Sequence, residues 1–215
     1  MDLNNSFEVA ADRATAWRVL NDVERIAPCL PGAQLEEVDG DEFKGNVKVK
    51  VGPVTAQYKG KATFLEQNEA EGRVVIKGDG RDSRGAGNAN ALITATLHEI
   101  DANNTRVDVH TDLSITGKVA QFGRGVMADV SGKLMGQFAE NLQELVAAES
   151  STAESSTVSA AAAPVEDTGP RKIEMPEAEA VDLLDAAGAP VFKRVLPIAG
   201  VAAVLLVLRR LFRRS

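Results

Sequence analysis

Apolar and polar residues alternate with a period of two along much of the first 115 residues, a pattern typical of strands that bury one face. Before the turn at Gly52 and Pro53 the apolar residues have odd numbers, and in the segment after it they have even numbers. The alternating segments are 5–9, 42–51, 54–64, 74–80, 89–97 and 107–115. Because short turns join most of them, they predict an antiparallel sheet with one face in contact with solvent.

Helical spacing appears before and after these strands. Two short helices are expected after the first strand, with Asp12 and Asp22 at the positions that cap helix N-termini. The second should end at Ile26, because the proline- and glycine-containing segment 28–32 breaks helices. A long helix is predicted over 118–148, where apolar residues recur every three or four positions.

The inward positions of the predicted sheet are poorly filled, since many are glycine or alanine. The long helix carries a second set of small residues beside its apolar stripe, at Gly125, Ala128, Gly132 and Gly136. Protein interiors are close-packed, so the missing volume has to be accounted for. The pattern leaves two explanations open, which are very tight packing of the helix on the sheet and a cavity between them.

A cavity between sheet and helix would have an almost entirely aliphatic lining. Tyr58, the single tyrosine, falls in the inward phase, and its hydroxyl could meet either a ligand carbonyl or a backbone partner. The expected lining is Val49, Val51, Tyr58, Phe64, Ile76, Ile93, Leu97, Val109, Leu113, Phe122, Gly125, Val126, Met127, Ala128, Val130 and Gly132, with Trp17, Leu20, Ile26 and Leu30 near the helix pair.

The chain changes character after residue 148. Residues 149–188 are rich in Ser, Ala, Glu and Pro, contain no aromatic residue, and so predict a flexible linker, with a short helix possible over 177–187. A coil of this length has a root-mean-square span of about 35 Å. Three segments are therefore expected: a ligand-binding domain over 1–148, this linker, and a tail over 189–215.

The tail combines a short apolar run with basic flanks and has no acidic residue. Its uncharged run of 14 residues, 195–208, is short for a hydrocarbon core of about 30 Å, but snorkelling arginines could extend it. We expect a membrane anchor that either spans the bilayer or lies in its interface. The anchoring residues are Lys193, Arg194, Val195, Leu196, Val204, Leu205, Leu206, Leu208, Arg209, Arg210, Phe212, Arg213 and Arg214.

Composition excludes several functions. The net charge of −7 disfavours a nucleic-acid partner, because phosphate neutralisation needs clustered Lys and Arg. One cysteine and two histidines leave no basis for a disulfide or a metal site. No secretory signal is visible at the N-terminus, which lacks a basic segment followed by an apolar one.

No set of residues suited to catalysis stands out. His98 and His110 fall in the outward phase of their strands, and Cys29 is predicted to be a small buried hydrophobe. The glycine-rich segment 81–90 joins two strands and predicts a mobile hairpin rather than a phosphate-binding loop. The acidic residues of 36–42 are expected to form a solvated turn or a docking patch. We therefore predict a protein that is not an enzyme.

The segments around the helix pair carry a family resemblance. Two parts of the chain resemble the CoxG family of carbon monoxide dehydrogenase subunits. The first consists of FEV at 7–9, AWRVLND at 16–22 and CLPG at 29–32, and the second runs from TGK at 116–118 through QFG at 121–123 to Phe138. The resemblance covers about residues 1–148. It implies an α+β, helix-grip (START-like, SRPBCC) fold, in which a seven-stranded antiparallel sheet wraps around a long C-terminal helix and encloses a hydrophobic cavity.

The same resemblance implies a partner and a place in the cell. Members of this family accompany the molybdenum-containing carbon monoxide dehydrogenase and are implicated in attaching it to the cytoplasmic face of the cell membrane. With a cavity, the chain is expected to carry a lipophilic quinone, menaquinone in hosts that use it, as a non-covalent cargo. The alternative is a membrane adaptor that recruits the dehydrogenase and has no ligand.

Overall fold

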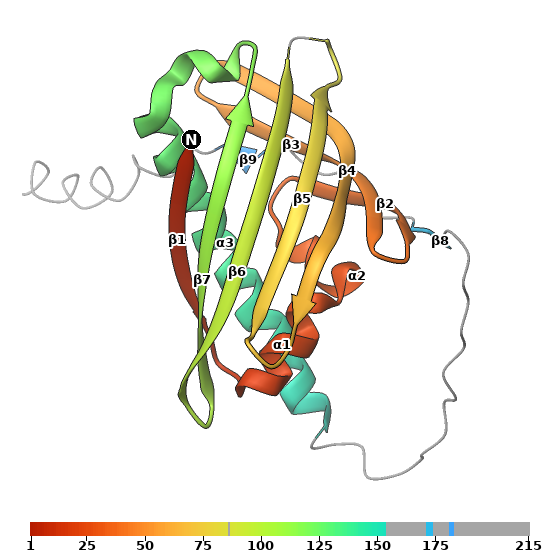
Figure 1. Cartoon of the computed structure of the whole chain (residues 1–215), viewed down its shortest axis with the longest axis vertical. Coiled ribbons are helices and arrows are strands. Elements are labelled where there is room, and N and C mark those ends of the chain that lie inside the picture. The colour runs from red at the N-terminus through yellow and green to blue at the C-terminus, as the bar shows by residue number, and fades with distance from the viewer. Residues whose placement is uncertain (86, 154–170, 174–180, 183–215) are drawn as a thin grey trace, which may run out of the picture. The chain divides into compact units, whose positions relative to one another are not determined.

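The computed structural model describes residues 1–85, 87–153, 171–173 and 181–182 (Figure 1). The elements, in chain order, are β1 (Asp2–Val9), α1 (Arg13–Asn21), α2 (Val23–Ile26), η1 (Ala27–Cys29), β2 (Ala33–Asp39), β3 (Glu42–Val51), β4 (Val54–Asn68), β5 (Arg73–Asp82), β6 (Asn88–Asp101), β7 (Asn104–Ile115), η2 (Val119–Phe122), α3 (Gly123–Ala153), β8 (Arg171–Lys172) and β9 (Val181–Asp182).

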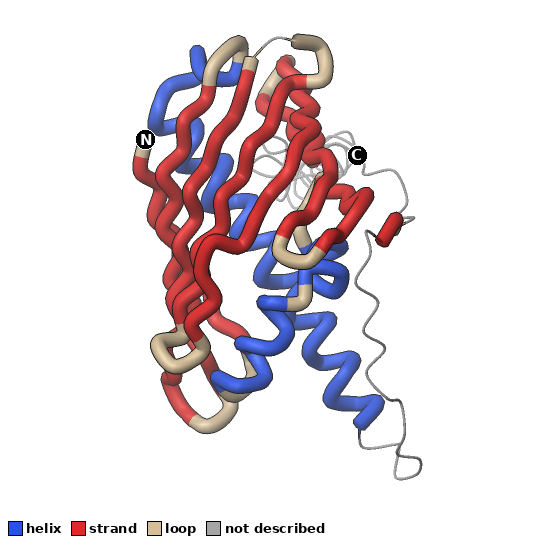
Figure 2. The backbone as a smooth tube through the Cα atoms, turned by 45° about the vertical axis from the view of Figure 1, so that its right-hand side comes forward, coloured by secondary structure: helices blue, strands red, loops and turns tan. Residues whose placement is uncertain are grey.

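Seven antiparallel strands form one continuous sheet in the order β1-β7-β6-β5-β4-β3-β2. The helices lie on one side of this sheet, and α3 packs on it mainly through β1 (Figures 1 and 2). This arrangement confirms the predicted α+β, helix-grip fold. The alternation predicted in the sequence is also correct, because the inward positions of neighbouring strands pair with one another, as in Phe64 with Ile76 and Ile76 with Ile93.

The two short helices begin where the sequence predicts. The Asp12 carboxylate accepts a hydrogen bond from the backbone N–H of Thr15 at 3.0 Å, which caps α1. This bond holds the pKa of Asp12 below its usual range. Asp22 caps α2 in the same way by accepting from the N–H of Arg25 at 3.2 Å. Each cap satisfies a donor that the first helical turn leaves without a partner.

Strand β2 has no counterpart among the strands that alternation predicts. Three acids, Glu36, Glu37 and Asp39, fall on both faces of this strand, so its apolar residues do not alternate. The pairing of β2 with β3 also shifts between Leu35 and Glu37, which marks a bulge. A bulge resets the period of two, and the sequence pattern therefore fails here.

A row of glycines crosses the sheet where β3 and β4 curve (Figure 1). Gly45 pairs with Gly60, and Gly60 pairs with Gly80 on the next strand. A Cβ atom on Gly60 would lie 2.7 Å from Cα of Gly80 and 2.9 Å from the carbonyl carbon of Asp79. The main chains of β4 and β5 thus approach more closely than any side chain allows, and glycine makes the bend possible.

The long helix differs from its predicted limits. Residues 119–122 form the separate turn η2, and α3 begins at Gly123, whose φ is +77°. A left-handed residue of this kind breaks the helical path, so the periodic pattern that starts at Lys118 spans two elements. At its other end α3 continues to Ala153, five residues beyond the predicted limit of the domain.

Two short strands come from the segment predicted as a linker. Arg171 and Lys172 pair with Val38 and Glu37 on the outer edge of β2, and the N–H of Ile173 donates to the carbonyl of Glu36 at 3.0 Å. Val181 and Asp182 pair in parallel with Val49 and Lys50 of β3. The helix considered over 177–187 is contradicted at Val181 and Asp182, which are extended, because the edge of β3 offers backbone partners there.

The predicted membrane anchor, residues 189–215, lies outside the described residues. Within the part of the chain that the structure describes, no helix is both long and apolar enough to cross a bilayer. Anchoring by the tail therefore stays a prediction.

Candidate functional site

The inner face of the sheet, which faces the helices, carries two packed hydrophobic clusters. The first lies at the end of the sheet where α1 packs. It contains Val9, Val19, Leu97, Val107, Val109, Phe138 and Leu142 among its buried members. The second lies around η2 and the first turns of α3, with Ala56, Val119 and Met127 buried and Val49, Tyr58, Phe122 and Val126 packed against them.

The part of the inner face between these clusters is apolar but only partly buried. Ile76, Gly78, Ala91 and Leu113 lie there and belong to neither cluster. A Cβ atom on Gly78 would meet nothing within 4 Å. We call this stretch the inner site, because it is the part of the inner face with room for a further group.

Most of the predicted lining residues reach the inner face. Trp17, Leu20, Ile26, Leu30, Ile93, Leu97 and Val109 belong to the first cluster, and Val49, Tyr58, Phe122, Val126 and Met127 to the second. Ile76, Leu113 and Val130 lie between them as partly buried residues, and Val51 is fully buried. These residues therefore lie on the inner face or on the helices that face it, and their role as the lining of a ligand cavity stays a prediction.

The small residues of the long helix are placed differently. Gly125, Ala128 and Gly132 are exposed, and a Cβ atom on Gly125 or Gly132 would meet nothing within 4 Å. Because α3 packs mainly on β1, one side of its first turns stays uncovered. The expectation that this stripe faces the sheet is wrong, and the stripe is not part of the inner site.

Tyr58 supplies a polar group next to the inner site. Burial, with a contribution from the negative charge of Asp82 opposite it on β5, raises the pKa of the Tyr58 hydroxyl. No hydrogen-bond partner of this hydroxyl lies among the described residues. The hydroxyl is therefore held in its protonated form and is available as a donor.

The raised pKa of Tyr58 gives a direct test of its burial. In an absorbance titration, this single tyrosine should ionise above the usual value of about 10 in the native protein and near 10 in the unfolded chain. The native state then holds the proton more tightly, so the free energy of unfolding should fall as the pH rises through 10 and be unaffected below it. Tyr58→Phe should remove the signal, and a native midpoint at or below 10 would contradict the placement.

One enclosed polar atom lies on α3. The side-chain oxygen Oε1 of Gln137 is enclosed and has no hydrogen-bond partner. Gln137 lies three helical turns from Val126, which packs on the second cluster, and one turn from Asn141. The Asn141 amide donates to the carbonyl of Cys29 in the first cluster at 2.9 Å. Met135 and Phe138, on either side of Gln137 along α3, belong to the first cluster, so Gln137 lies beside that cluster.

A separate groove opens between the helix pair and the turn that joins β2 and β3. Its volume is about 760 Å³, and its walls include Trp17, Val38 and Phe64. Acidic residues, Asp22, Glu24, Asp41 and Glu69, surround it with Arg18. Trp17 and Phe64, both predicted for the inner cavity, also form walls of this groove.

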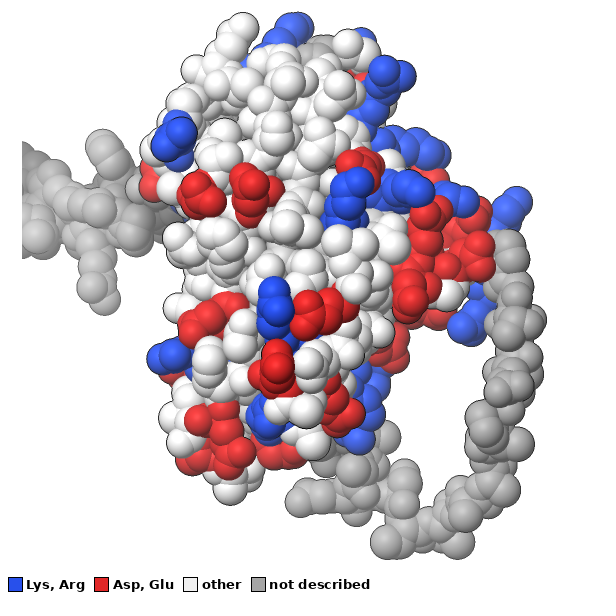
Figure 3. Space-filling view, in the orientation of Figure 1, with Lys and Arg blue, Asp and Glu red and all other residues white. Residues whose placement is uncertain are grey.

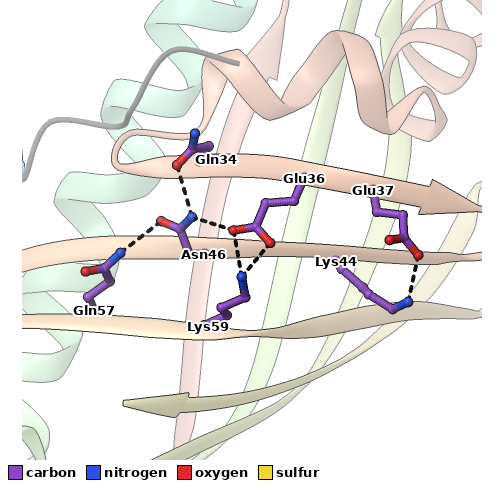
Figure 4. A network of polar contacts seen from close by, with 7 residues as sticks. All are labelled: Gln34, Glu36, Glu37, Lys44, Asn46, Gln57 and Lys59. Atoms are coloured by element: carbon purple, nitrogen blue, oxygen red, sulfur yellow. Dashed lines mark hydrogen bonds and ion pairs between the residues drawn. The ribbon is translucent and has the colours of Figure 1, made fainter. Parts of the chain in front are cut away.

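The acidic residues of 36–42 are largely paired with lysines of neighbouring strands (Figure 4). Glu36 accepts from Lys59 at 2.8 Å, and Glu37 accepts from Lys44 at 2.7 Å. The bond from Lys59 lowers the pKa of Glu36, and the bond to Glu37 raises the pKa of Lys44. Figure 3 shows the result, in which acidic and basic side chains alternate over β2, β3 and β4. This region is not a free acidic patch.

The titratable groups singled out in the sequence do not assemble into a catalytic site. His98 and His110 are exposed and face Asp108 and Asp2 at 3.2 and 3.7 Å. Cys29 is buried, and burial raises the pKa of its thiol, so it is a weak nucleophile. Among the described residues, no group of three or more His, Cys, Asp or Glu side chains could hold a metal ion.

One solved structure has the same fold, and others are similar to this chain over most of its length. A conserved protein from Geobacillus kaustophilus is 21% identical, with a TM-score of 0.63, and the match covers 69% of this chain and 97% of that one. Norcoclaurine synthase from Thalictrum flavum is 15% identical, with a TM-score of 0.49 and coverage of 69% and 87%. The Zhui aromatase/cyclase from a Streptomyces species is 14% identical, with a TM-score of 0.44 and coverage of 70% and 93%.

Comparison of the sequence with protein families identifies one family. No curated protein matches the chain. The sequence model of CoxG, a carbon monoxide dehydrogenase subunit, matches residues 6–147, which include every element from α1 to η2 and nearly all of the sheet.

Proposed function

Because the chain belongs to the CoxG family of carbon monoxide dehydrogenase subunits and is thus a dehydrogenase-associated protein, we propose that it binds a lipophilic quinone at the inner site and carries it between membrane and enzyme. The dehydrogenase is the partner that family membership implies. The quinone, the membrane anchor and a location at the cytoplasmic face of the membrane are parts of the proposal.

The observation that supports a quinone is the open, apolar stretch between the two hydrophobic clusters. Its walls are aliphatic, which suits an isoprenoid tail, and space beside Gly78 is free of protein atoms. Tyr58 is a polar group near it whose hydroxyl can donate, which suits a ring oxygen rather than a charged head group. Ligand sites are commonly of this kind, with few polar groups in an apolar surface.

No step of catalysis is assigned to this chain. Reduction of a quinone to a quinol takes two electrons and two protons, and the dehydrogenase is the proposed source of both. The residues of the chain would bind the ring and tail, exclude water and release the ligand. Menaquinone is the expected cargo in hosts that use it.

Fractionation and solvent extraction test both parts of the proposal. The full chain should sediment with membranes, and organic extraction of the purified protein should release quinone. A 1–188 truncation keeps β8 and β9 and removes the basic tail, so it should stay folded and move to the soluble fraction. Circular dichroism provides the control for folding.

Two results would contradict the proposal. If the 1–188 protein still sediments with membranes, the tail is not the anchor. If the membrane-extracted full chain contains no quinone and binds none when quinone is added, the chain is an adaptor without a ligand.

A further inference from the structure

We propose that the folded domain itself faces an anionic lipid bilayer with one end of its sheet, where four exposed cations gather. We call this end the basic end, and its cations are Arg81, Arg84, Lys118 and Arg124. The inference rests on the proposed function and deepens it, because it takes the tail as the membrane anchor and names the surface of the domain that meets the lipid headgroups.

The basic end is built from two connections that hydrogen bonds hold together. Two of the cations lie where β5 leads into β6, and the other two lie on either side of η2. The N–H of Asn88 donates to Oγ1 of Thr116 at 2.8 Å, and the N–H of Thr116 donates to the carbonyl of Asn88 at 2.9 Å. The N–H of Ser83 donates to the carbonyl of Gln57 on β4 at 2.8 Å. The four cations therefore share one end of the sheet, beside the start of β4.

The cations of the basic end have no carboxylate partner among the described residues. The acidic residues nearest to them in the sequence are engaged or set apart. Asp79 pairs with Lys77 at 3.2 Å, Asp82 is buried, and Asp129 lies more than one turn further along α3 than Arg124. The four positive charges are thus available to bind anionic groups outside the protein.

Acidic residues are segregated from this end of the molecule. Segments 43–65, 83–98 and 113–128 contain none, and the upper end of the view in Figure 3 shows basic side chains with few acidic ones among them. The turns at the opposite end of the sheet, from β4 to β5 and from β6 to β7, carry exposed acidic residues, which are Glu69, Glu71, Glu99 and Asp101. An anionic bilayer would attract the basic end, with about a fivefold gain in affinity for each basic residue close to it, and would repel the opposite end.

The path of the chain favours the same orientation. The chain leaves the described domain near the basic end, because β9 pairs with β3 at Val49 and Lys50, close to the turn into β4. Lys193, the first residue of the predicted anchor, follows Asp182 of β9 by eleven residues, which span at most about 40 Å. The sheet is about 45 Å long at the 14-residue strand β6. A tail anchored in the bilayer would therefore bring the basic end, and not the opposite end, against it.

Energy transfer from a labelled protein to a labelled lipid tests this orientation. Ser83→Cys places a dye at the basic end and Asn103→Cys places one at the opposite end, since both residues are exposed. Cys29 is buried, so a maleimide dye reacts at the introduced cysteine. On vesicles of phosphatidylcholine and phosphatidylglycerol that contain an acceptor-labelled lipid, the full-length protein should transfer energy several-fold more efficiently from the Ser83→Cys dye than from the Asn103→Cys dye.

Neutralising the basic end should abolish this difference. The variant combines four substitutions in the full chain: Arg81→Gln, Arg84→Gln, Lys118→Gln and Arg124→Gln. The matched control removes the same charge from exposed cations elsewhere on the domain, through Lys44→Gln, Lys77→Gln, Arg106→Gln and Lys172→Gln. The control should keep the difference between the two dyes. On vesicles of phosphatidylcholine alone, which carry no net charge, the unsubstituted basic end should also lose its preference.

The outcomes separate this inference from the proposed function. Equal transfer from the two dyes on anionic vesicles, or stronger transfer from the Asn103→Cys dye, would overturn the orientation while attachment by the tail stands. A preference that survives neutralisation of the four cations would overturn their role in the same way. If the full-length protein binds vesicles of neither composition, the membrane part of the proposed function fails, and this inference fails with it.

Discussion

Replacing Gly78 with leucine should leave the melting temperature of the protein within about 2 °C of the wild type and abolish its retention of quinone. Gly78 pairs with Ala62 and Ala91, so its surroundings on the inner face are small. A Cβ atom there meets nothing within 4 Å, and the new side chain therefore enters open space rather than a packed core. Filling that space removes room for a ring or an isoprenoid tail.

Gly132→Leu is the control for this experiment. It adds the same side chain at another glycine without near neighbours, but on the exposed stripe of α3. We expect this variant to retain quinone as the wild type does. If Gly78→Leu also retains quinone, the carrier hypothesis fails and the adaptor remains. If Gly78→Leu melts far below the wild type, the inner face is filled rather than hollow.

Gly60→Val should destabilise the protein by at least about 3 kcal/mol and lower its melting temperature by roughly 6–12 °C. A Cβ atom at this position would collide with the main chain of Asp79 and Gly80, which cannot move aside as a side chain would. The pairing of β4 with β5 would have to open at the bend. Thermal unfolding followed by circular dichroism measures the effect.

Gly78→Val makes the same substitution on the adjacent strand and should change the melting temperature little. The two positions are both glycines in inward phase, so strand propensity affects them alike. A Gly60→Val protein as stable as the wild type would show that the curved sheet does not depend on close approach at this row.

The sequence predicts those parts of the fold whose signals are local. Asp12 and Asp22 each bond to an N–H three residues away, so the starts of α1 and α2 can be read from the chain. Alternation over β3 to β7 likewise assigns the inward face, because the sheet buries one side. Strand β2 is not predicted, because its acidic residues interrupt the alternation. They pair with lysines of β3 and β4, and this pairing is visible only in the folded structure.

The candidate site is predictable only in part. The apolar lining follows from strand phase, but the exposure of Gly132 depends on α3 packing against one edge of the sheet, which no local pattern encodes. The enclosed oxygen of Gln137 is not foreseen either, because its burial depends on how α3 packs beside the first cluster.

The pairing of Arg171–Lys172 with β2 also bears on how the protein avoids self-association. An uncovered edge strand offers its amide and carbonyl groups to any second chain, which leads to aggregation. Here the segment occupies those groups at Glu36, Glu37 and Val38, and it adds two cations and an ion pair between Arg171 and Glu24 at 3.2 Å. A protein cut after α3 would lose this cover. The segment 171–173 therefore covers an edge at which a second chain would otherwise pair.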